Sequence, residues 1–184
     1  MKVLLHSCCA PCANQCIDIL HQEGCQPTLF WYNPNIHPFT EFRLRRDSLR
    51  TYAQLEGLPM IDGGEYELRM FLTETMGDID NRCRKCYMMR IEKTAMYAAE
   101  NGYDGFTTSL LISPYQNHGE IKQIASEFAA QYKVNFIYKD FRPHFKAGQQ
   151  TARDLGLYMQ KYCGCIFSEE ERFIKSKKAK ISQA

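Results

Sequence analysis

The sequence contains no apolar run of the roughly 18 residues that a membrane-spanning helix requires. The apolar stretch near its start, Val3–Leu5, is too short to be the core of a signal peptide. An excess of charge of one sign is also missing, since the formal net charge is +2 and charged residues make up 24% of the 184 residues. We therefore expect a cytoplasmic protein with no membrane partner. The composition excludes intrinsic disorder and a strongly basic nucleic-acid binder, so that any contact with nucleic acid must be local.

Glycine-rich nucleotide loops are missing too. No G-x-G-x-x-G pattern occurs, which argues against a nicotinamide cofactor. The segment Ser7–Ala10, which follows the first expected strand, has none of the glycines of a phosphate-binding loop. This weakens the hypothesis of an ATP-dependent or sulfur-transfer enzyme. Internal repeats are likewise missing, and a chain of this length is expected to form one domain.

What the sequence does have is cysteine, at nine positions. In a reducing cytosol a framework of structural disulfides is not expected. Cys16 and Cys25 are isolated and fit small core residues. The other seven cluster in three short groups, which are Cys8, Cys9 and Cys12, then Cys83 and Cys86, then Cys163 and Cys165. This clustering predicts metal or redox chemistry.

Short apolar runs alternate with helical patterns, which predicts an α/β fold. We expect a single domain over residues 1–184, with a mostly parallel sheet flanked by helices, Rossmann-like and HUP-like. Strands are expected over 2–5, 27–32, 104–111 and 134–138, with a weak strand or loop over 57–62. Helices are expected from Pro11 to before Gly24, over 41–55 and 66–76, after a cap at 78–81, and from Pro114. The basic tail from about residue 175 is interpreted as a frayed end.

Two cysteine groups are expected at one edge of this sheet. Ligands of open parallel sheets gather at the carboxyl ends of the strands, and Cys8, Cys9 and Cys12 directly follow the first expected strand. Cys83 and Cys86 are three residues apart at a helix start, where they share a face and where the helix dipole favours anionic thiolates. Together the two groups could enclose a metal ion or cluster.

Spacing alone leaves three interpretations open. Cys9 and Cys12 form a C-x-x-C that could be a thioredoxin-like dithiol, although Cys83 and Cys86 would then be unexplained. The two C-x-x-C pairs also satisfy a structural four-thiolate zinc site, although 70 residues between them are unusually many. The adjacent Cys8 and Cys9 are awkward for tetrahedral zinc but suit a larger iron–sulfur cluster.

Five segments carry a resemblance that separates these interpretations. They are LLHSCCAPC (Leu4–Cys12), FWYNPNIHP (Phe30–Pro38), CRKCYMMR (Cys83–Arg90), TTSLLISPYQN (Thr107–Asn117) and YCGC (Tyr162–Cys165). In this order, and over nearly the whole chain, they resemble the signatures of the QueH-type epoxyqueuosine reductases. We see no departure from the family pattern at these positions.

The resemblance implies an oxidoreductase that reduces epoxyqueuosine at the wobble position of tRNA to queuosine, with the epoxide oxygen leaving as water. It also implies a 4Fe-4S cluster held by Cys8, Cys9, Cys83 and Cys86. Cys12 is expected either to bind an additional iron ion near the cluster or to line the pocket. The expected partners are the anticodon loop of tRNAs with a GUN anticodon and an external electron donor. The alternative is a non-catalytic zinc-binding RNA module that uses the same cysteines.

The resemblance further implies a redox-active disulfide between Cys163 and Cys165. A disulfide across the single Gly164 would close a small strained ring, and strain makes a disulfide easier to reduce. Such a bond would suit an electron relay. The alternative is two buried thiols or two extra metal ligands.

Polar side chains near the strand ends complete the predicted site. The candidates for substrate binding are Tyr32, Asn33, Asn35, His37, Glu41, Arg45, Ser109, Ser113 and Gln116. The asparagines could instead satisfy their own turn, and Ser113 could cap a helix. Arg45 could hold a phosphate and Glu41 a metal or a leaving hydroxyl, or the two could form an ordinary surface ion pair. A splayed-out base is expected to stack on aromatics such as Phe30, Trp31 or Tyr115.

Overall fold

The computed structural model describes the backbone of residues 1–181 and the side chains of residues 1–174. Five parallel strands form one sheet in the order β3-β2-β1-β4-β5. The strands are β1 (Lys2–His6), β2 (Gln26–Trp31), β3 (Met60–Asp62), β4 (Gly105–Thr108) and β5 (Asn135–Phe136). The helices are α1 (Ala10–Gln22), α2 (Phe39–Leu55), α3 (Leu68–Thr75), α4 (Arg82–Glu100), α5 (His118–Tyr132), α6 (Phe145–Asp154) and α7 (Ile166–Ile181), with 3-10 turns η1 (Ser109–Ile112) and η2 (Arg142–His144). The predicted α/β class with a parallel sheet is confirmed.

The central strand β1 carries the register of the sheet. Leu5 of β1 lies opposite Leu29 of β2 on one side and opposite Thr107 of β4 on the other. Val3, Leu4 and Leu5 are all fully buried. Because both faces of a parallel sheet are covered, such a strand is apolar at every position and not at alternate ones.

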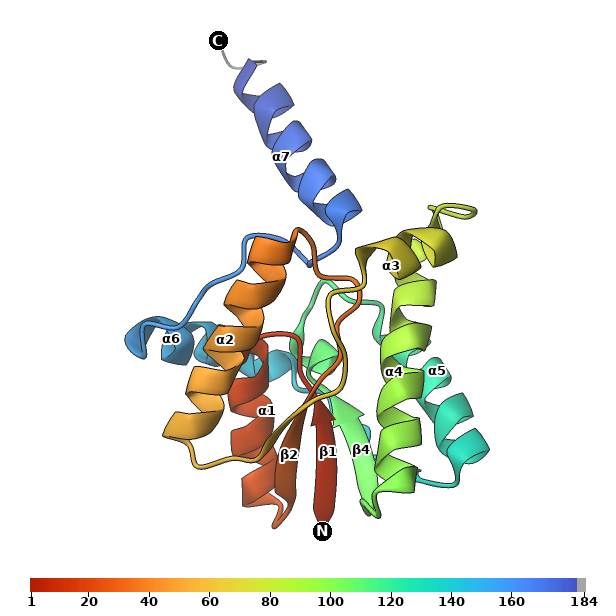
Figure 1. The fold of residues 1–184 in the computed structure, drawn as a ribbon. Helices are drawn as coiled ribbons and strands as arrows, with labels where there is room; N and C mark the ends of the chain where they lie inside the picture. Colours follow the sequence, from red (N-terminus) through yellow and green to blue (C-terminus); the bar gives the residue numbers. More distant parts are fainter. Residues whose placement is uncertain (182–184) are drawn as a thin grey trace.

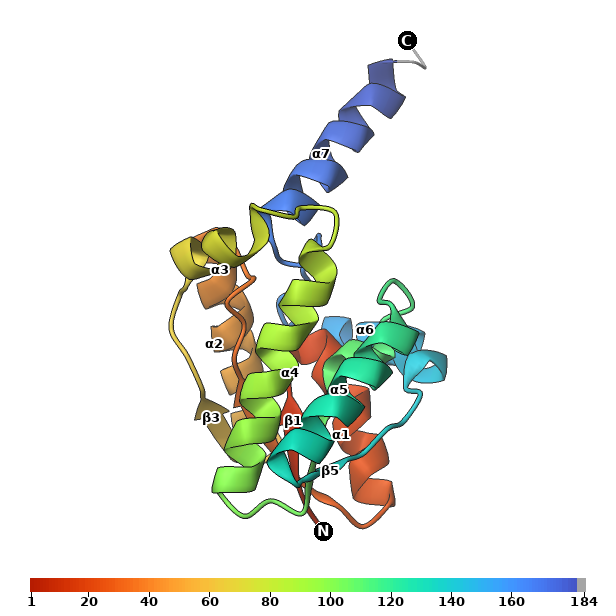
Figure 2. The ribbon, with the colours of Figure 1, turned by 90° about the vertical axis from the view of Figure 1, so that its right-hand side faces the viewer.

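The helices cover the two faces of the sheet in two groups. Figures 1 and 2 show α1 and α2 on one face and α4 and α5 on the other. The chain therefore moves outward from β1 through β2 to β3, then crosses back and moves outward again through β4 to β5. The strand order reverses between β1 and β4, and this reversal opens a crevice at the carboxyl ends of those two strands.

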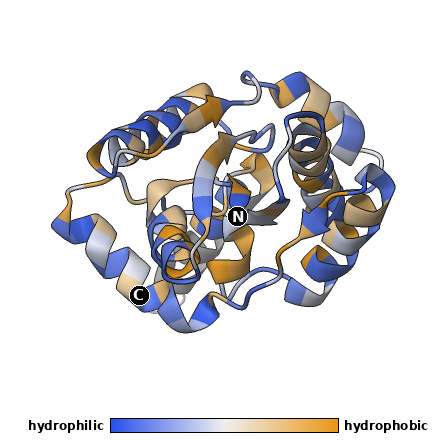
Figure 3. Ribbon diagram, turned by 90° about the horizontal axis from the view of Figure 1, so that it is seen from below, coloured by the Kyte–Doolittle hydropathy of each residue, from blue (hydrophilic) through white to orange (hydrophobic). Residues whose placement is uncertain are grey.

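Each helix turns an apolar face to the sheet. On α5 the buried positions are Ile121, Ile124, Ala125 and Phe128, at helical spacing. Seen from below in Figure 3, apolar colour gathers on the inward sides of the helices and hydrophilic colour on their outer sides. This burial, and not helix propensity alone, stabilises the layers.

Helix α6 packs closely on α1 at one glycine. Asn14 of α1 donates from Nδ2 to the carbonyl oxygen of Gly148 at 2.8 Å. A Cβ atom on Gly148 would lie 2.7 Å from Asn14 Oδ1 and 3.0 Å from the carbonyl oxygen of Pro11. Only glycine fits this approach, which fixes the segment after α6 beside the start of α1.

Several predicted element boundaries were wrong. The helix expected from Pro114 begins at His118, because Asn117 is its N-cap and accepts a hydrogen bond from the Glu120 amide at 3.2 Å. The cap expected within residues 78–81 is also different: Asn81 stands at the N-cap of α4 but makes no capping bond with its side chain. The 3-10 turn η1 replaces the second half of the strand expected over 104–111.

Helix α7 extends away from the α/β body in Figures 1 and 2. Its backbone is helical to Ile181. The frayed end predicted from about residue 175 falls on residues whose side chains lie outside the described part, and it stays a prediction. Within residues 1–181, no helix is both long and apolar enough to cross a membrane.

Candidate metal centre and substrate pocket

Three thiols converge where β1 passes into α1. The chain is extended at Cys9, the N-cap of α1, and Pro11 stands in the first turn of the helix, where no amide donor is needed. Cys8, Cys9 and Cys12 are buried, and their sulfur atoms all lie within 4.8 Å of one another. The Cys8 sulfur also lies 3.9 Å from Ser109 Oγ, which follows β4. The crevice of the sheet therefore holds a compact trio of sulfur donors.

The pKa values of the three thiols are shifted in different directions. Hydrogen bonds with the Cys12 and Cys9 thiols hold the pKa of Cys8 well below its usual range, against the opposing effect of burial. Burial first, and then hydrogen bonds with the Cys12 and Cys8 thiols, raise the pKa of Cys9. The hydrogen bond with Cys8 raises the pKa of Cys12. Cys8 is thus the thiol of the three that ionises first.

Gln160 covers the trio from the segment between α6 and α7. Its Nε2 donates to the Cys9 sulfur at 2.9 Å and approaches the Cys12 sulfur at 3.6 Å. Its Oε1 is buried and has no hydrogen-bond partner among the described residues. The amide therefore donates to sulfur on one side and keeps a free acceptor on the other.

The α4 thiols are not part of the trio: the group of sulfur atoms within 4.8 Å of one another contains Cys8, Cys9 and Cys12 but neither Cys83 nor Cys86. Cys86 is buried, and burial raises the pKa of its thiol to about 12, although Arg90 opposes this change. Burial of Cys86 therefore opposes the ionisation that the helix dipole favours. Cys83 is exposed, one turn earlier on α4.

The buried Arg90 contacts Cys86 and lines the same cavity as Cys8. Arg90 Nη1 lies 3.6 Å from the Cys86 sulfur, and Nη2 donates to Asn33 Oδ1 at 3.0 Å. Its Nε donates to His6 Nε2 at 3.3 Å. Burial, and after it the charge of Arg90, lower the pKa of His6 to about 3, so this ring is neutral.

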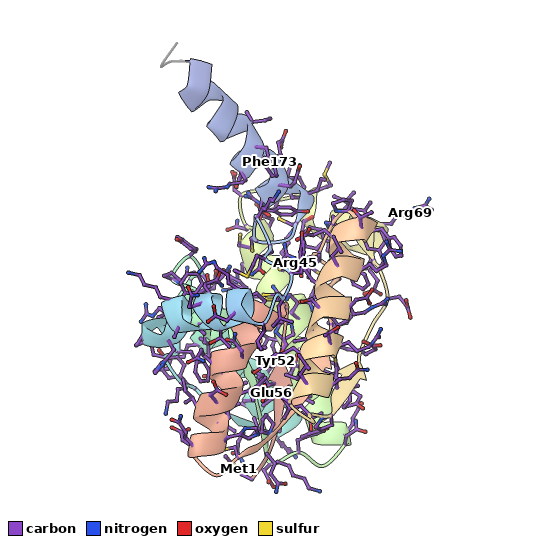
Figure 4. The ribbon with its side chains drawn as sticks, turned by 90° about the vertical axis from the view of Figure 1, so that its left-hand side faces the viewer. Met1, Arg45, Tyr52, Glu56, Arg69 and Phe173 are labelled. Atoms are coloured by element: carbon purple, nitrogen blue, oxygen red, sulfur yellow. The ribbon has the colours of Figure 1, made fainter. Side chains whose placement is uncertain are left out.

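The third cysteine group lies in a loop that is hydrogen-bonded to Arg45 of α2. Arg45 Nη1 donates to the carbonyl oxygen of Cys163 at 2.8 Å, and Nη2 donates to that of Tyr162 at 2.9 Å. Between the two cysteines, Gly164 has a φ of 147°, and a Cβ atom there would lie 3.1 Å from Asn35 Nδ2. In Figure 4, Arg45 lies far from Met1, toward the end of the molecule from which α7 leaves.

The expected disulfide between Cys163 and Cys165 is not supported, since both are free thiols in the structure. Their sulfur atoms have different surroundings. Gln116 Nε2 lies 3.5 Å from the exposed Cys163 sulfur, whereas the buried Cys165 sulfur accepts from the Ser168 amide at 3.4 Å. Cys165 also packs in an apolar cluster with Cys86 and Phe71. The loop thus turns one thiol outward and the other toward α4.

A cavity of about 380 Å³ opens over these groups. Seven residues predicted for the site line it: Cys8, Cys12, Arg45, Ser109, Ser113, Gln116 and Cys163. The lining also includes Arg90, Phe145 and Gln160, with Tyr115 at the rim, where it is 85% exposed. Cys8, Cys12 and Cys163 are the cysteines among the lining residues.

The candidates of the loop after β2 do not line this cavity. Asn33 is buried and donates from Nδ2 to the carbonyl oxygen of Ser7 at 2.9 Å, so it braces the loop that carries Cys8. Asn35 and His37 are buried as well, and burial lowers the pKa of His37 to about 4. Tyr32 is partly buried, and its carbonyl oxygen lies 3.2 Å from His6 Nε2. These residues lie outside the lining of the cavity, and Asn33 supports the loop that carries Cys8.

Glu41 and Arg45 form a buried pair and not a surface pair. Arg45 Nε donates to Glu41 Oε1 at 2.7 Å, and the Tyr158 hydroxyl donates to Glu41 Oε2 at 2.5 Å. The guanidinium of Arg45 therefore donates to the Glu41 carboxylate and to two backbone carbonyl oxygens of the loop that carries Cys163.

Sequence reasoning missed three residues of the site: His6, Arg90 and Gln160. Arg90 had a readable signal, because it follows Cys86 by four residues and so shares its helix face. His6 had a weaker one, since it ends β1 two residues before Cys8. Gln160 had none, because its approach to Cys9 depends on how the segment after α6 folds back over 151 residues of chain.

The residues present suit a soft metal or an iron–sulfur cluster. Thiolates are the ligands that such groups prefer, and the trio supplies three sulfur donors without a carboxylate among them. Gln160 Nε2 and Arg90 Nη1 point N–H groups at sulfur from outside, as outer-shell partners of a metal centre do. The trio of Cys8, Cys9 and Cys12 could therefore hold a metal.

A parallel α/β sheet with a sulfur-lined crevice at its switch point defines a thiol-based α/β protein equipped for metal or redox chemistry. A sequence profile described as epoxyqueuosine reductase QueH matches residues 3–171. The chain belongs to the epoxyqueuosine reductase QueH family, and the resemblance seen in the sequence is confirmed.

Relatives extend over the same length. The chain is 38% identical to the epoxyqueuosine reductase QueH of Dehalococcoides mccartyi, and the matched region covers 95% of this chain and 96% of the relative. It is 36% identical to that of Thermotoga maritima, with 98% and 96% covered. A crystal structure described as a predicted subunit of a tRNA methyltransferase from Methanocaldococcus jannaschii is similar at a TM-score of 0.54 and 13% identity, covering 83% of this chain and 74% of that one. This last likeness shows the fold alone.

Proposed function

We propose that the chain is an oxidoreductase that reduces epoxyqueuosine at the wobble position of tRNA to queuosine, the last step of queuosine biosynthesis. One observation supports this most: in a chain of the QueH family, a trio of buried thiols contributes two of its members, Cys8 and Cys12, to the lining of an open cavity. The reaction consumes two electrons and two protons, opens both C–O bonds of the epoxide, and leaves an alkene and one water. The place of action is the cytoplasm, where tRNA is modified.

The cofactor of this proposal is a 4Fe-4S cluster held by Cys8, Cys9, Cys83 and Cys86, with Cys12 available for an additional iron ion. When bound, the cluster supplies single-electron transfer and a Lewis-acidic iron edge at the cavity. Cys8 is already the most acidic thiol of its trio, which favours its role as a ligand because metals bind the thiolate. Ser109 and Gln160 shape the space around the trio.

The electrons reach the site through the thiols of Cys163 and Cys165 in this proposal. Oxidation of the two thiols to a disulfide releases two electrons and two protons, which balances the reduction of the epoxide to alkene and water. An external electron donor then reduces the disulfide. The exposed Cys163 lines the cavity and is accessible to both reactants.

The substrate enters as a splayed-out nucleotide of the anticodon loop of tRNAs with a GUN anticodon. Tyr115 and Phe145 offer aromatic faces at the mouth, and Lys161 and Arg172 supply positive charge for phosphates nearby. Ser113 and Gln116 provide polar groups along the wall. The buried residues after β2 hold the thiol loop in place.

Turnover is tested with protein purified without oxygen, tRNA carrying epoxyqueuosine and a chemical reductant. Mass analysis of the digested nucleosides should show loss of one oxygen, and the protein should contain iron and acid-labile sulfide. Colourless protein with stoichiometric zinc and no loss of oxygen would contradict the proposal. Cys86→Ser should remove both cluster absorbance and turnover, whereas Cys25→Ala, at an isolated buried cysteine, should keep both.

A further inference from the structure

Arg90 is a buried cation without a carboxylate partner. Its exposure is 2%, and it lies on α4 four residues after Cys86. Among the ion pairs of the described residues none involves Arg90, in contrast to Arg45, which is paired with Glu41. Removing a guanidinium from water costs several kcal/mol unless an anion compensates it. The fold must therefore supply an anion at this position.

The neutral groups around Arg90 do not supply that anion. Asn33 accepts a hydrogen bond through Oδ1, and His6 accepts one through Nε2. An amide and an imidazole are not anions, so neither group can balance the charge of Arg90. The remaining contact of the guanidinium is the Cys86 sulfur at 3.6 Å.

Arg90 also lies between the three cysteine groups. It lines the same cavity as Cys8 and Cys163, and it contacts Cys86 directly. Thiols are therefore the groups near this cation that become anions when they bind a metal.

We propose that Arg90 is a positioning residue whose fixed positive charge balances the anionic sulfur centre and raises the reduction potential of the cofactor bound there. The inference rests on the proposed iron–sulfur function and goes beyond it, because it assigns the control of potential to one side chain. Reduction adds negative charge to the centre, so a buried cation beside it favours the reduced form. Asn33 and His6 hold the guanidinium toward sulfur.

The test compares five variants of the reconstituted protein. Arg90→Met removes the charge, Arg90→Lys keeps it, and Asn33→Asp places a carboxylate 3.0 Å from Nη2 so that the charge is neutralised with arginine still present. Asn33→Leu is the control for Asn33→Asp, since it loses the same hydrogen bond to Ser7 without adding charge. Arg84→Met, at a partly exposed arginine of the same helix that is paired with Glu120, is the control for position.

Iron content, folding by circular dichroism and the midpoint potential are measured at constant pH. We expect Arg90→Met and Asn33→Asp to reduce the equilibrium constant for one-electron reduction at least tenfold, which is about 59 mV toward negative potential. Arg90→Lys and Arg84→Met should stay within threefold of the unchanged protein, and Asn33→Leu should shift the potential less than Asn33→Asp does. If Arg90→Met does not fold, Asn33→Asp carries the same test.

Loss of iron from folded Arg90→Met and Asn33→Asp, with iron kept in Arg90→Lys, would also support the inference. Unchanged potentials in loaded Arg90→Met and Asn33→Asp would overturn it and leave the proposed function standing. So would iron loss in all three variants, because charge would then not be the determinant. Absence of iron and sulfide from the unchanged protein would instead overturn the proposed function, and this inference with it.

Discussion

The guanidinium of Arg45 donates to the carbonyl oxygen of Cys163 at 2.8 Å, across 118 residues of sequence. The same side chain is paired with Glu41 at 2.7 Å, and both side chains are almost fully buried, at 1% and 8% exposure. One arginine of α2 therefore fixes the loop that presents the outward thiol. The geometry of that loop therefore depends on a buried charge pair.

Arg45→Met should destabilise the protein by about 3–5 kcal/mol, because it leaves the Glu41 carboxylate buried without its cation. Urea unfolding measures this change. The double variant E41Q/R45M should recover part of the loss, since it removes the orphaned charge. Arg43→Met, at an exposed residue of α2, should change stability by no more than about 0.5 kcal/mol. Equal stability of R45M and the unchanged protein would contradict the assignment.

Gln160→Leu should weaken metal binding at the trio. The substitution removes the N–H donor that lies 2.9 Å from the Cys9 sulfur, and loss of an outer-shell partner typically lowers metal affinity or activity by about 10–100-fold. Competition with an iron chelator measures the affinity. Gln150→Leu, at a glutamine of α6 bonded to Asp154, is the matched control and should behave like the unchanged protein. Wild-type iron retention in Gln160→Leu would show that the amide has no part in binding.

The sequence was sufficient for the sheet and its thiol edge, because local patterns determine both. Val3, Leu4 and Leu5 form a run with no polar interruption, which is typical of a strand buried on both faces, and the position of Cys8 after this strand follows at once. The carboxyl edge then follows from parallel order alone. Family membership was also readable, because it depends on residue identities and spacing.

The surroundings of each thiol could not be read in the same way. Whether Cys86 is anionic depends on the balance between desolvation and nearby charge, and this balance is fixed only once Arg90 and Phe71 are packed around it. Glu41 and Arg45 have the spacing of a surface pair, and only the returning segment with Tyr158 buries them. The partners that decide the chemistry are distant in the chain.

Cys163→Ser and Cys165→Ser should each remove turnover while leaving the iron content unchanged. Our reason is that oxidation of the two thiols supplies the electron pair, and a serine cannot form the disulfide. Turnover is measured by nucleoside mass analysis, and iron by colorimetric assay. Cys25→Ala should retain both properties. Iron loss in Cys163→Ser would identify this residue as a metal ligand, and full turnover would exclude the thiol from the electron path.

Tyr115→Ala should raise KM for tRNA by about 5–150-fold with little change in kcat, because stacking of a base on an aromatic ring contributes about 1–3 kcal/mol. The ring is 85% exposed at the mouth of the cavity, and it meets the Phe145 ring edge to face at 6.1 Å, which leaves a face open to a base. Tyr115→Phe should behave like the unchanged protein, since it keeps the ring. Tyr138→Ala serves as the control on another surface, where the tyrosine lies against Lys122. A KM of Tyr115→Ala equal to that of Tyr138→Ala would mean that the substrate does not stack here, and the base would have to be held by the polar wall around Gln116 instead.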